Sequence, residues 1–418
     1  MAGREASDAA ARRAAEQALR RSYGKLVAFL AARTGDVAAA EDALSGAVTQ
    51  ALTHWPAKGC PANPEAWLLT VARRKLTDAH RRRRTAEAAG PDVALLAEGL
   101  AAAQAAEAEI PDQRLALMFA CAHPAIDAAA RAPLMLQTVI GLGAAPIASA
   151  FLVSPAAMGQ RLVRAKAKIR AAAIPFAIPP AEALPERLEA VLDAIYAAYS
   201  EGWSDPGGAD PARRDLTDEA LYLARLASEL APDEPEALGL LALTLYAEAR
   251  RAARRGPAGQ YTPLADQDPA LWDGPMIAEA EAALRRASAM GRIGRYQLEA
   301  ALQSAHIHRR RTGADNWAEV VRLYDALIAL TASPVAAVNR ALALAEAEGP
   351  AAGLAALPDL AADPRLEGYQ PYWAARADLL ARSGAAPDAA HAYDIAIGLE
   401  RDPAVRAFLM QRRSALAL

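Results

Sequence analysis

Few side chains in this sequence have the type and spacing that catalysis or metal binding requires. Cys121 and His123 lie close together before Pro124, where the end of a packed helix is expected, because free cysteine usually behaves as a small buried hydrophobic residue. His306 and His308 are also two positions apart, and on a helix that spacing directs the side chains to different faces, which disfavours a shared metal ion. We therefore expect no enzyme, no metal site and no cofactor.

Basic side chains, in contrast, gather on two segments with helical periodicity. The first segment begins at Asn63, whose side chain can cap a helix with Pro64 at its first position, and it continues to about residue 84. One predicted face is apolar and consists of Leu68, Ala72, Leu76 and Ala79. Another face carries Arg73, Arg74, Thr77, Arg81 and Arg84. For a single basic helix, a solvated charged face is as reasonable an interpretation as contact with nucleic acid.

The second basic segment has the spacing of a helix-turn-helix motif. Between residues 143 and 172 the sequence predicts a short helix, a turn at residues 152–154 and a longer helix capped by Ser154. The longer helix has an apolar stripe formed by Met158, Leu162, Ala165 and Ile169. Its opposite side carries Ala157, Gln160, Arg161, Arg164 and Lys168. Glutamine and arginine can bond to base edges and lysine can bind phosphates, so this helix is suited to a DNA major groove.

Composition and charge place these two segments within a larger helical protein. The 418 residues are too many for one ordinary helical core, and alanine dominates while aromatic residues make up only 5%, which favours an all-α fold of two or three domains. Residues 1–175 carry a net charge of +7 and residues 176–418 a net charge of −10, whereas residues 86–109 contain five acidic side chains and no basic one. The sequence therefore predicts two basic modules that flank an acidic linker, followed by an acidic half.

Composition gives no sign of export or membrane insertion. The two cysteines, Cys60 and Cys121, lack the paired spacing of a zinc site or a disulfide framework, which fits a reducing cytoplasm. Residues 1–11 contain no apolar signal core, and the longest strictly apolar run, residues 115–122, is well short of the roughly 20 residues that a membrane span needs. We expect a cytoplasmic protein with no membrane partner.

The C-terminal part begins with a Pro-rich connector at residues 174–180 and shows signs of helical repeats. Similar short motifs at residues 230–235, 330–334 and 399–403 each end in a proline. These prolines are 99 and 69 residues apart. The gaps are close to three and two times ~34 residues, the tetratricopeptide period. An insertion at residues 251–272 interrupts the pattern. The sequence thus predicts a repeat-like helical extension.

The insertion ends in Trp272 and the phrase Asp273-Gly274-Pro275, which is typical of a turn leading into a helix. A second interpretation makes Asp273, Gly274 and Pro275 a regulatory loop whose acidic side chain presses on a basic DNA-binding face. In that interpretation, replacing Asp273 with Ala alters promoter output, whereas for a simple turn it does not.

The amino-acid sequences of both modules resemble those of a known family. Residues 40–44 (AEDAL) and 64–74 (PEAWLLTVARR) are similar to the polymerase-binding helix and the start of the −10 recognition helix of extracytoplasmic-function sigma factors, within the sigma-70 family. The second module resembles the subgroup with a C-terminal tetratricopeptide-like extension through residues 110–115 (IPDQRL), 148–153 (ASAFLV) and 160–166 (QRLVRAK). The resemblance therefore extends over nearly the whole chain.

The resemblance implies the order of domains along the chain. It gives an N-terminal tail at residues 1–18, a sigma-2 domain at 19–86, the acidic linker at 87–109, a sigma-4 helix-turn-helix domain at 110–175 and a helical extension at 176–418. It also implies that the protein is an RNA polymerase sigma factor, which directs transcription initiation without a catalytic group of its own. The extension would act in place of a separate regulatory protein, with an unknown regulator or ligand.

The resemblance also assigns contacts to residues of this chain. Binding to the clamp of core RNA polymerase falls on Glu41, Asp42 and Gln50. Reading of the −10 element falls on the loop at residues 55–63 and the helix after it, through Trp55, Asn63, Arg73, Arg74, Thr77 and Arg81. The sigma-4 domain would bind the −35 element and the polymerase flap, through Ser154, Ala157, Gln160, Arg161, Arg164 and Lys168.

Several positions depart from the family pattern and leave an alternative open. Ser45-Gly46 stands in the clamp-binding helix, Ala144-Ala145-Pro146 replaces a polar cap, and Gly159 occupies a common phosphate-contact position. Of these features, Ser45-Gly46 and Gly159 favour a helical-repeat scaffold that no longer binds DNA and docks only to another protein. Two separate cationic helices argue against that alternative, because a module freed from DNA has no need of them. The sequence therefore predicts an active sigma factor.

Overall fold

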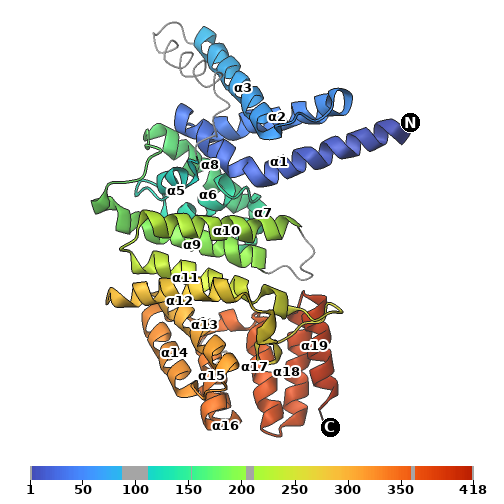
Figure 1. Cartoon of the computed structure of the whole chain (residues 1–418), viewed down its shortest axis with the longest axis vertical. Coiled ribbons are helices and arrows are strands. Elements are labelled where there is room, and N and C mark those ends of the chain that lie inside the picture. The colour runs from blue at the N-terminus through green and yellow to red at the C-terminus, as the bar shows by residue number, and fades with distance from the viewer. Residues whose placement is uncertain (1, 87–111, 152, 204–210, 359–362, 417–418) are drawn as a thin grey trace. The chain divides into compact units, whose positions relative to one another are not determined.

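The computed structural model describes the chain except for residues 1, 87–111, 152, 204–210, 359–362 and 417–418, so the predicted acidic linker lies outside the described residues. The described residues form helices, and their one β feature is an isolated antiparallel bridge between Arg255 and Tyr261 (Figure 1). The predicted all-α class is therefore confirmed. In the part of the chain that is described, no helix has both the length and the apolar character to cross a bilayer.

The chain divides into two compact units. Unit 1 comprises Met1–Ser200 together with Asp215–Glu219, and unit 2 comprises Glu201–Arg214 and Ala220–Leu418. Helix α9 (Leu184–Trp203) falls largely in unit 1, and one turn of helix α10 (Pro211–Leu230) belongs to unit 1 as well. The division between the two compact units therefore lies beyond residue 175, where the sequence predicted a domain boundary. Unit 1 includes most of α9, the first helix of the predicted extension.

The first basic module, residues 19–86, contains three helices, α1 (Ala2–Thr34), α2 (Val37–Lys58) and α3 (Pro64–Ala86). The predicted break between the first two is present. Gly35 has a φ of 64°, and the Asp36 side chain accepts a hydrogen bond from the Ala39 N–H at 3.0 Å, which caps α2. Helix α1 begins at Ala2, so the segment expected as an N-terminal tail is part of the first helix.

The loop after α2 is shorter than the sequence predicted, and Trp55 is not part of it. Helix α2 continues through Pro56 to Lys58, and Trp55 is only 3% exposed. Its indole packs edge-on against Trp67 of α3, with ring centroids 5.4 Å apart. Burial of Trp55 and its packing on the partly buried Trp67 outweigh the cost of a proline near the helix end, because aromatic side chains contribute heavily to packing.

The second basic module, residues 110–175, contains helices α5 (Arg114–Cys121), α6 (Ala128–Thr138), α7 (Ala144–Ala150) and α8 (Pro155–Ala171). Every residue of α5 is buried, which explains the long apolar run in the sequence. Burial raises the pKa of Cys121 to about 12, and its thiol lies 3.7 Å from the Thr138 hydroxyl. The interpretation of Cys121 as a packed hydrophobic residue is therefore confirmed.

Unit 2 is a succession of packed helices. Helix α10 is followed by α11 (Pro235–Ala249), α12 (Gly274–Ala289), α13 (Arg295–Thr312), α14 (Trp317–Thr331), α15 (Pro334–Glu348), α16 (Pro350–Ala356), α17 (Gln370–Arg382), α18 (Ala386–Leu399) and α19 (Pro403–Ser414). Consecutive helices such as α11 and α12, α14 and α15, and α17 and α18 pack on one another (Figure 1). The three prolines that end the repeated motifs each begin a helix, namely α11, α15 and α19.

The insertion in unit 2 ends in a helix cap. Residues 251–272 contain three short 3-10 helices, and Trp272 at the end is buried. Asp273 accepts a hydrogen bond from the Met276 N–H at 2.9 Å, and Gly274 and Pro275 begin α12. The turn leading into a helix is thus confirmed. The regulatory role of Asp273, Gly274 and Pro275 stays a prediction, and capping α12 fully accounts for the Asp273 carboxylate.

Candidate nucleic-acid interface

Helix α8 is built so that one side packs and the other is free. The Ser154 hydroxyl accepts a hydrogen bond from the Ala157 N–H at 3.3 Å, and Pro155 occupies the first helical position. The predicted stripe of Met158, Leu162, Ala165 and Ile169 is buried. Because this stripe fixes the rotation of the helix about its axis, the opposite side chains must face outward.

Two helices and a turn hold α8 in place. Helix α7 packs on α8, and the chain between them turns through Val153, whose N–H donates to the Ala148 carbonyl at 3.0 Å. Helix α6 supports α8 from another side, since Arg161 Nη1 donates to the Ala129 carbonyl at 3.2 Å. The geometry therefore has the succession of helix, turn and helix that the sequence predicted.

The outward side of α8 presents polar and cationic groups. Ala157, Gln160, Arg164 and Lys168 are exposed, whereas Arg161 is half-buried because of its bond to α6. Within the described residues, neither Arg164 nor Lys168 forms an ion pair or a hydrogen bond through its side chain. Two unpaired cations one helical turn apart can each contact a phosphate oxygen, at no cost in broken intramolecular pairs.

Of the predicted cations of helix α3, the described residues include Arg73, which is partly buried, and Arg74, which is exposed. The Asn63 carboxamide oxygen accepts from the Ala66 N–H at 3.0 Å, so Asn63 caps the helix as expected. Arg73 is half-buried with its guanidinium 4.9 Å from the centre of the Phe29 ring, and the Thr77 hydroxyl donates to the Arg73 carbonyl. Burial and the nearby Arg33 lower the pKa of Arg73. Arg74 is exposed, whereas the side chains of Arg81 and Arg84 lie outside the described residues.

The three residues assigned to the polymerase clamp lie on one helix but in different surroundings. Asp42 and Gln50 are exposed on α2, whereas Glu41 is partly buried. The Glu41 carboxylate pairs with Lys166 of α8 at 2.5 Å and accepts a hydrogen bond from the Tyr23 hydroxyl at 3.5 Å. Gly46 lies against the side chain of Lys75 on α3. Asp42 and Gln50 are therefore accessible on the surface of unit 1, whereas the Glu41 carboxylate is paired with Lys166.

Sequence reasoning missed the charged groups that hold unit 1 together. Arg114 is buried at the start of α5, where its guanidinium bonds to Asp112 and to Glu219 of α10. Burial lowers the pKa of Arg114, but hydrogen bonds and charges from Asp112 and Glu219 outweigh that effect and leave the pKa above its ordinary value. An arginine that begins a fully apolar helix was a signal of a buried partner. The identity of Glu219, 105 positions away, was not readable from the sequence.

The two histidines of α13 lie in different surroundings. His306 is largely buried, with its Nδ1 accepting from Arg309 at 3.2 Å, whereas His308 is exposed. The described residues contain no group of three or more His, Cys, Asp or Glu side chains placed to hold a metal ion. The prediction that the two histidines point to different environments is confirmed.

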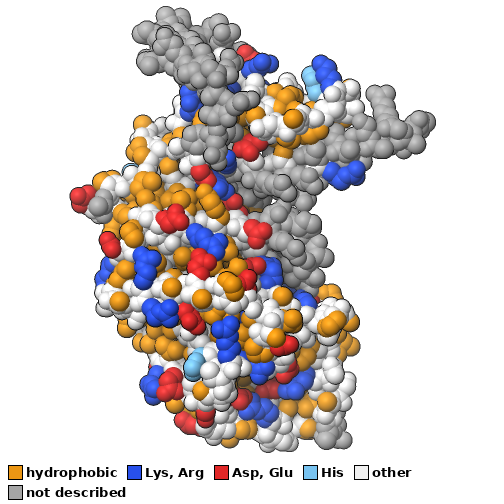
Figure 2. Space-filling view, in the orientation of Figure 1, with side chains coloured by type: hydrophobic (Ala, Val, Ile, Leu, Met, Phe, Trp, Pro, Cys, Tyr) orange, Lys and Arg blue, Asp and Glu red, His pale blue; other side chains and the backbone are white. Residues whose placement is uncertain are grey.

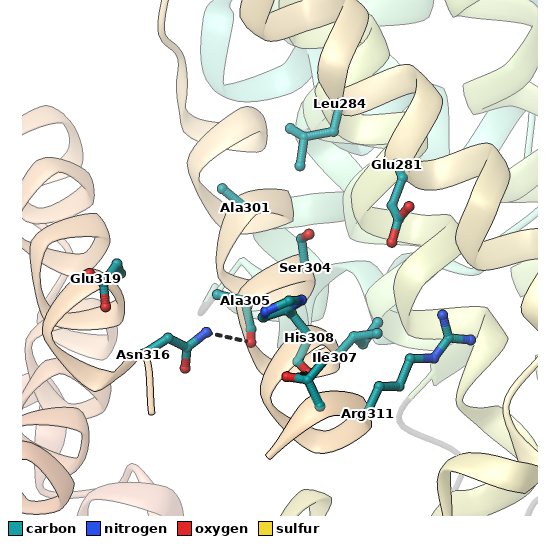
Figure 3. Close-up of a pocket in the computed structure, with 11 residues that line it drawn as sticks. Glu281, Leu284, Ala301, Ser304, Ala305, Ile307, His308, Arg311, Asn316 and Glu319 are labelled. Carbon is teal, nitrogen blue, oxygen red and sulfur yellow. Dashed lines mark hydrogen bonds between the residues drawn. The ribbon is translucent and has the colours of Figure 1, made fainter. Parts of the chain in front are cut away.

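Unit 2 has a groove of mixed polarity lined by α12, α13 and the start of α14. It has a volume of about 570 Å³ and contains side chains of both signs, with Glu281 on one wall and His308 and Arg311 on another (Figure 3). Asn316 lies at its edge and donates to the Ala305 carbonyl at 2.9 Å. This groove could not be predicted from the sequence, because its walls come from helices that only the tertiary structure brings together.

Comparison with known proteins identifies the first module. Residues 18–86 match the family model described as Sigma-70 region 2, and residues 187–288 match one described as Family of unknown function (DUF6596). An uncharacterized protein of Rhizobium meliloti (strain 1021) is 41% identical over 383 residues, which make up 90% of each chain. No solved structure matches the chain.

The chain carries a sigma-70 region 2 module, which supports a sigma-factor-like role. It belongs to the same family as the Rhizobium protein, and the shared region is long enough to include most of both units. The second family model covers helices α9 to α12, which begin the extension.

Proposed function

We propose that this protein is a sigma factor that recruits core RNA polymerase to promoters with −10 and −35 elements and starts transcription, with its C-terminal extension as the regulator. The match of residues 18–86 to sigma-70 region 2 supports core polymerase and promoter DNA as partners. The observation that carries the proposal is the outward side of α8, where Arg164 and Lys168 are exposed and unpaired among the described residues. Phosphate contacts by unpaired cations supply most of the affinity of DNA-binding helices.

The proposed contacts divide among three helices. Helix α8 enters the −35 major groove, with Gln160 at base edges and Arg164 and Lys168 on phosphates. The loop between α2 and α3 and the exposed Arg74 contact the −10 element, while Trp55 supports that loop by packing on Trp67. Helix α2 binds the polymerase clamp. This arrangement needs no catalytic group, because DNA opening draws on binding energy.

Promoter-directed transcription in vitro tests the proposal, with core polymerase from the same organism and full-length protein. We expect the Arg164→Ala/Lys168→Ala variant to lose transcript by about tenfold or more, since each lost phosphate contact weakens DNA binding. The matched control is Arg285→Ala, which removes one positive charge from a side chain on α12 that is 73% exposed. Transcript that the α8 variant leaves unchanged would contradict the assignment of α8.

The same assay distinguishes the alternative function. A protein that binds no core polymerase and yields no transcript in any form is the helical-repeat scaffold instead. Gly159 is the position on α8 that favours that outcome, because glycine supplies no side-chain contact there, although an added Cβ atom would meet nothing within 4 Å.

The effect of the extension is best tested with a truncated protein that still contains all residues of unit 1. A fragment ending near Ile174 lacks α9 and Glu219, so Arg114 loses a partner and a loss of activity would have two explanations. A fragment ending at Leu230 keeps α9 and the whole of α10, which carries Glu219. If the extension inhibits, this fragment transcribes more strongly than the full chain, and if it assists, the fragment transcribes more weakly. Circular dichroism of the fragment checks that its helices remain.

A further inference from the structure

Within unit 1, the two basic modules are packed against each other at a point where only glycine fits. The turn after α6 lies on α1 so closely that a Cβ atom at Gly24 would be 1.8 Å from the Val139 carbonyl oxygen. In the same turn Gly141 has a φ of 80° and lies on the Tyr23 ring, where a Cβ atom would be 2.9 Å from Cδ1. A side chain at Gly24 therefore cannot be accommodated unless the modules separate, because its neighbour is backbone.

A second contact between the modules is electrostatic. Lys166 of α8 pairs with Glu41 of α2, and the two side chains are only 13% and 16% exposed. Four residues further along α8, Arg170 pairs with Asp36 at 3.3 Å, and Asp36 is the cap of α2. The Tyr23 hydroxyl reaches the same Glu41 carboxylate. Helix α8 is thus held along the N-terminal half of α2 by two ion pairs in succession.

The contact also has an apolar part. Helix α5 of the second module is buried along its whole length and packs on both α1 and α6. Separation of the modules would expose part of this helix to water, which opposes opening. The contact therefore combines close backbone packing, partly buried ion pairs and apolar burial, as a specific interface does.

We propose that unit 1 is a closed form in which the second module covers part of the polymerase-binding face of the first, so that core polymerase must displace α8 from α2. The inference rests on the proposed function, because Glu41 is one of the three residues assigned to the clamp. Asp42 and Gln50 remain exposed and offer polymerase a first contact. A protein that is open only part of the time binds with an apparent affinity reduced by the open fraction.

The closed form can be measured without polymerase. Cys60 is exposed and accepts a spin label, whereas Cys121 is fully buried with its pKa raised to about 12 and stays unlabelled at neutral pH. A second label at Val163→Cys, a position on α8 that is 66% exposed, gives a distance between the two modules. Unlabelled protein is used for the affinity measurement.

Two variants open the contact by different means, and a third is the control. Gly24→Ala favours helix α1 itself but clashes with the Val139 carbonyl, and Lys166→Glu places like charges at Glu41. Gly159→Ala is the matched control, because the same substitution in α8 meets nothing within 4 Å. We expect both opening variants to lengthen and broaden the distance between the labels and to bind core polymerase about tenfold more tightly, while the control changes neither.

The outcomes separate this inference from the proposed function. Unchanged distances in both opening variants, with normal polymerase binding by the parent protein, overturn the closed form and leave the sigma factor intact. Longer distances without tighter polymerase binding overturn the restraint on the clamp-binding face. Longer distances with no polymerase binding by any form overturn the proposed function and the restraint together.

Discussion

The two units of this protein differ in whether their exposed cationic side chains form ion pairs. In unit 2 most described arginines on the surface are paired with acids from the same or a neighbouring helix; examples are Arg225 with Glu279, Arg340 with Asp325, Arg382 with Glu346, Arg412 with Asp378 and Arg413 with Asp394. In unit 1 the exposed cations Arg74, Arg164 and Lys168 form no ion pair within the described residues. Blue and red side chains accordingly lie side by side over much of the visible face of unit 2 (Figure 2).

This difference shows how the same residue type serves two purposes. A paired surface arginine has its charge largely cancelled, so it contributes modestly to stability and little to the field that a partner meets. An unpaired arginine contributes little to stability but keeps its charge available for phosphates. The exposed cations of unit 1 are therefore suited to DNA, whereas those of unit 2 tie neighbouring helices together.

Unit 1 also contains paired cations, such as Lys166 and Arg170, and the most deeply buried of the three, Arg114, provides the strongest test of the comparison. Its buried guanidinium pairs with Asp112 and Glu219, so Arg114→Ala leaves two carboxylates without their partner. We expect the variant to lower the free energy of unfolding of unit 1 by about 3–5 kcal/mol. Urea unfolding, combined with hydrogen exchange in α5 and α10, measures this loss. Arg164→Ala is the control and should leave stability nearly unchanged; equal losses in both variants would erase the distinction between paired and free cations.

His306 gives unit 2 a pH-dependent contribution to its stability. Burial, with help from Arg309 and Arg250, lowers the pKa of His306 to about 4, whereas an unfolded histidine titrates near ~6.5. Between these values the unfolded chain binds more protons, so stability is complete above about pH 6.5 and is lost as the pH falls toward about 4, by on the order of 3 kcal/mol.

Hydrogen exchange of α13 between pH 5 and 7 tests this dependence. Opening of α13 should become easier as the pH falls, and His306→Leu should flatten that trend. His308→Leu is the matched control, because His308 is exposed on the same helix. A trend that is as steep in His306→Leu as in the parent would show that another group carries it.

The free cations of α8 should act on DNA affinity and its salt dependence. Arg164→Ala/Lys168→Ala removes two phosphate contacts, so the slope of log affinity against log salt should fall by about 2 and the affinity by ~2 kcal/mol at moderate salt. Fluorescence anisotropy with a promoter duplex measures both. Gln160→Ala, in contrast, should reduce discrimination between base sequences while the salt slope stays the same. An unchanged slope in the double variant would mean that α8 does not bind phosphates.

The smallest effect is expected where a surface pair joins two helices of unit 2. Arg225 and Glu279 form two hydrogen bonds of 3.0 and 2.9 Å, but the side chains are 39% and 44% exposed. Arg225→Ala should lower stability by less than about 1 kcal/mol and leave DNA binding unchanged. A double-mutant cycle with Glu279→Ala measures the pair itself. A coupling above about 2 kcal/mol would show that these surface pairs carry more of unit 2 than their exposure implies.

The local structure could be predicted from sequence wherever nearby residues decide it. Asp36, Asn63 and Ser154 cap the helices they were expected to cap, because a cap involves only a side chain and backbone a few residues away. The packing stripe of α8 followed from helical spacing for the same reason. Trp55 was misplaced in a loop because the proline after it suggests a helix end, and only its packing on Trp67 reverses that expectation.

The sequence by itself determined the helices, the charge asymmetry and the two cationic surfaces, since these depend on periodicity, capping and composition. Only the tertiary structure decided which charges are free. Glu41 and Lys166 are 125 positions apart and Arg114 and Glu219 are 105 apart, so neither spacing nor propensity relates them. Whether a charge meets a partner depends on how helices distant in sequence pack, and that packing is fixed by apolar burial and by close approach at glycines such as Gly24.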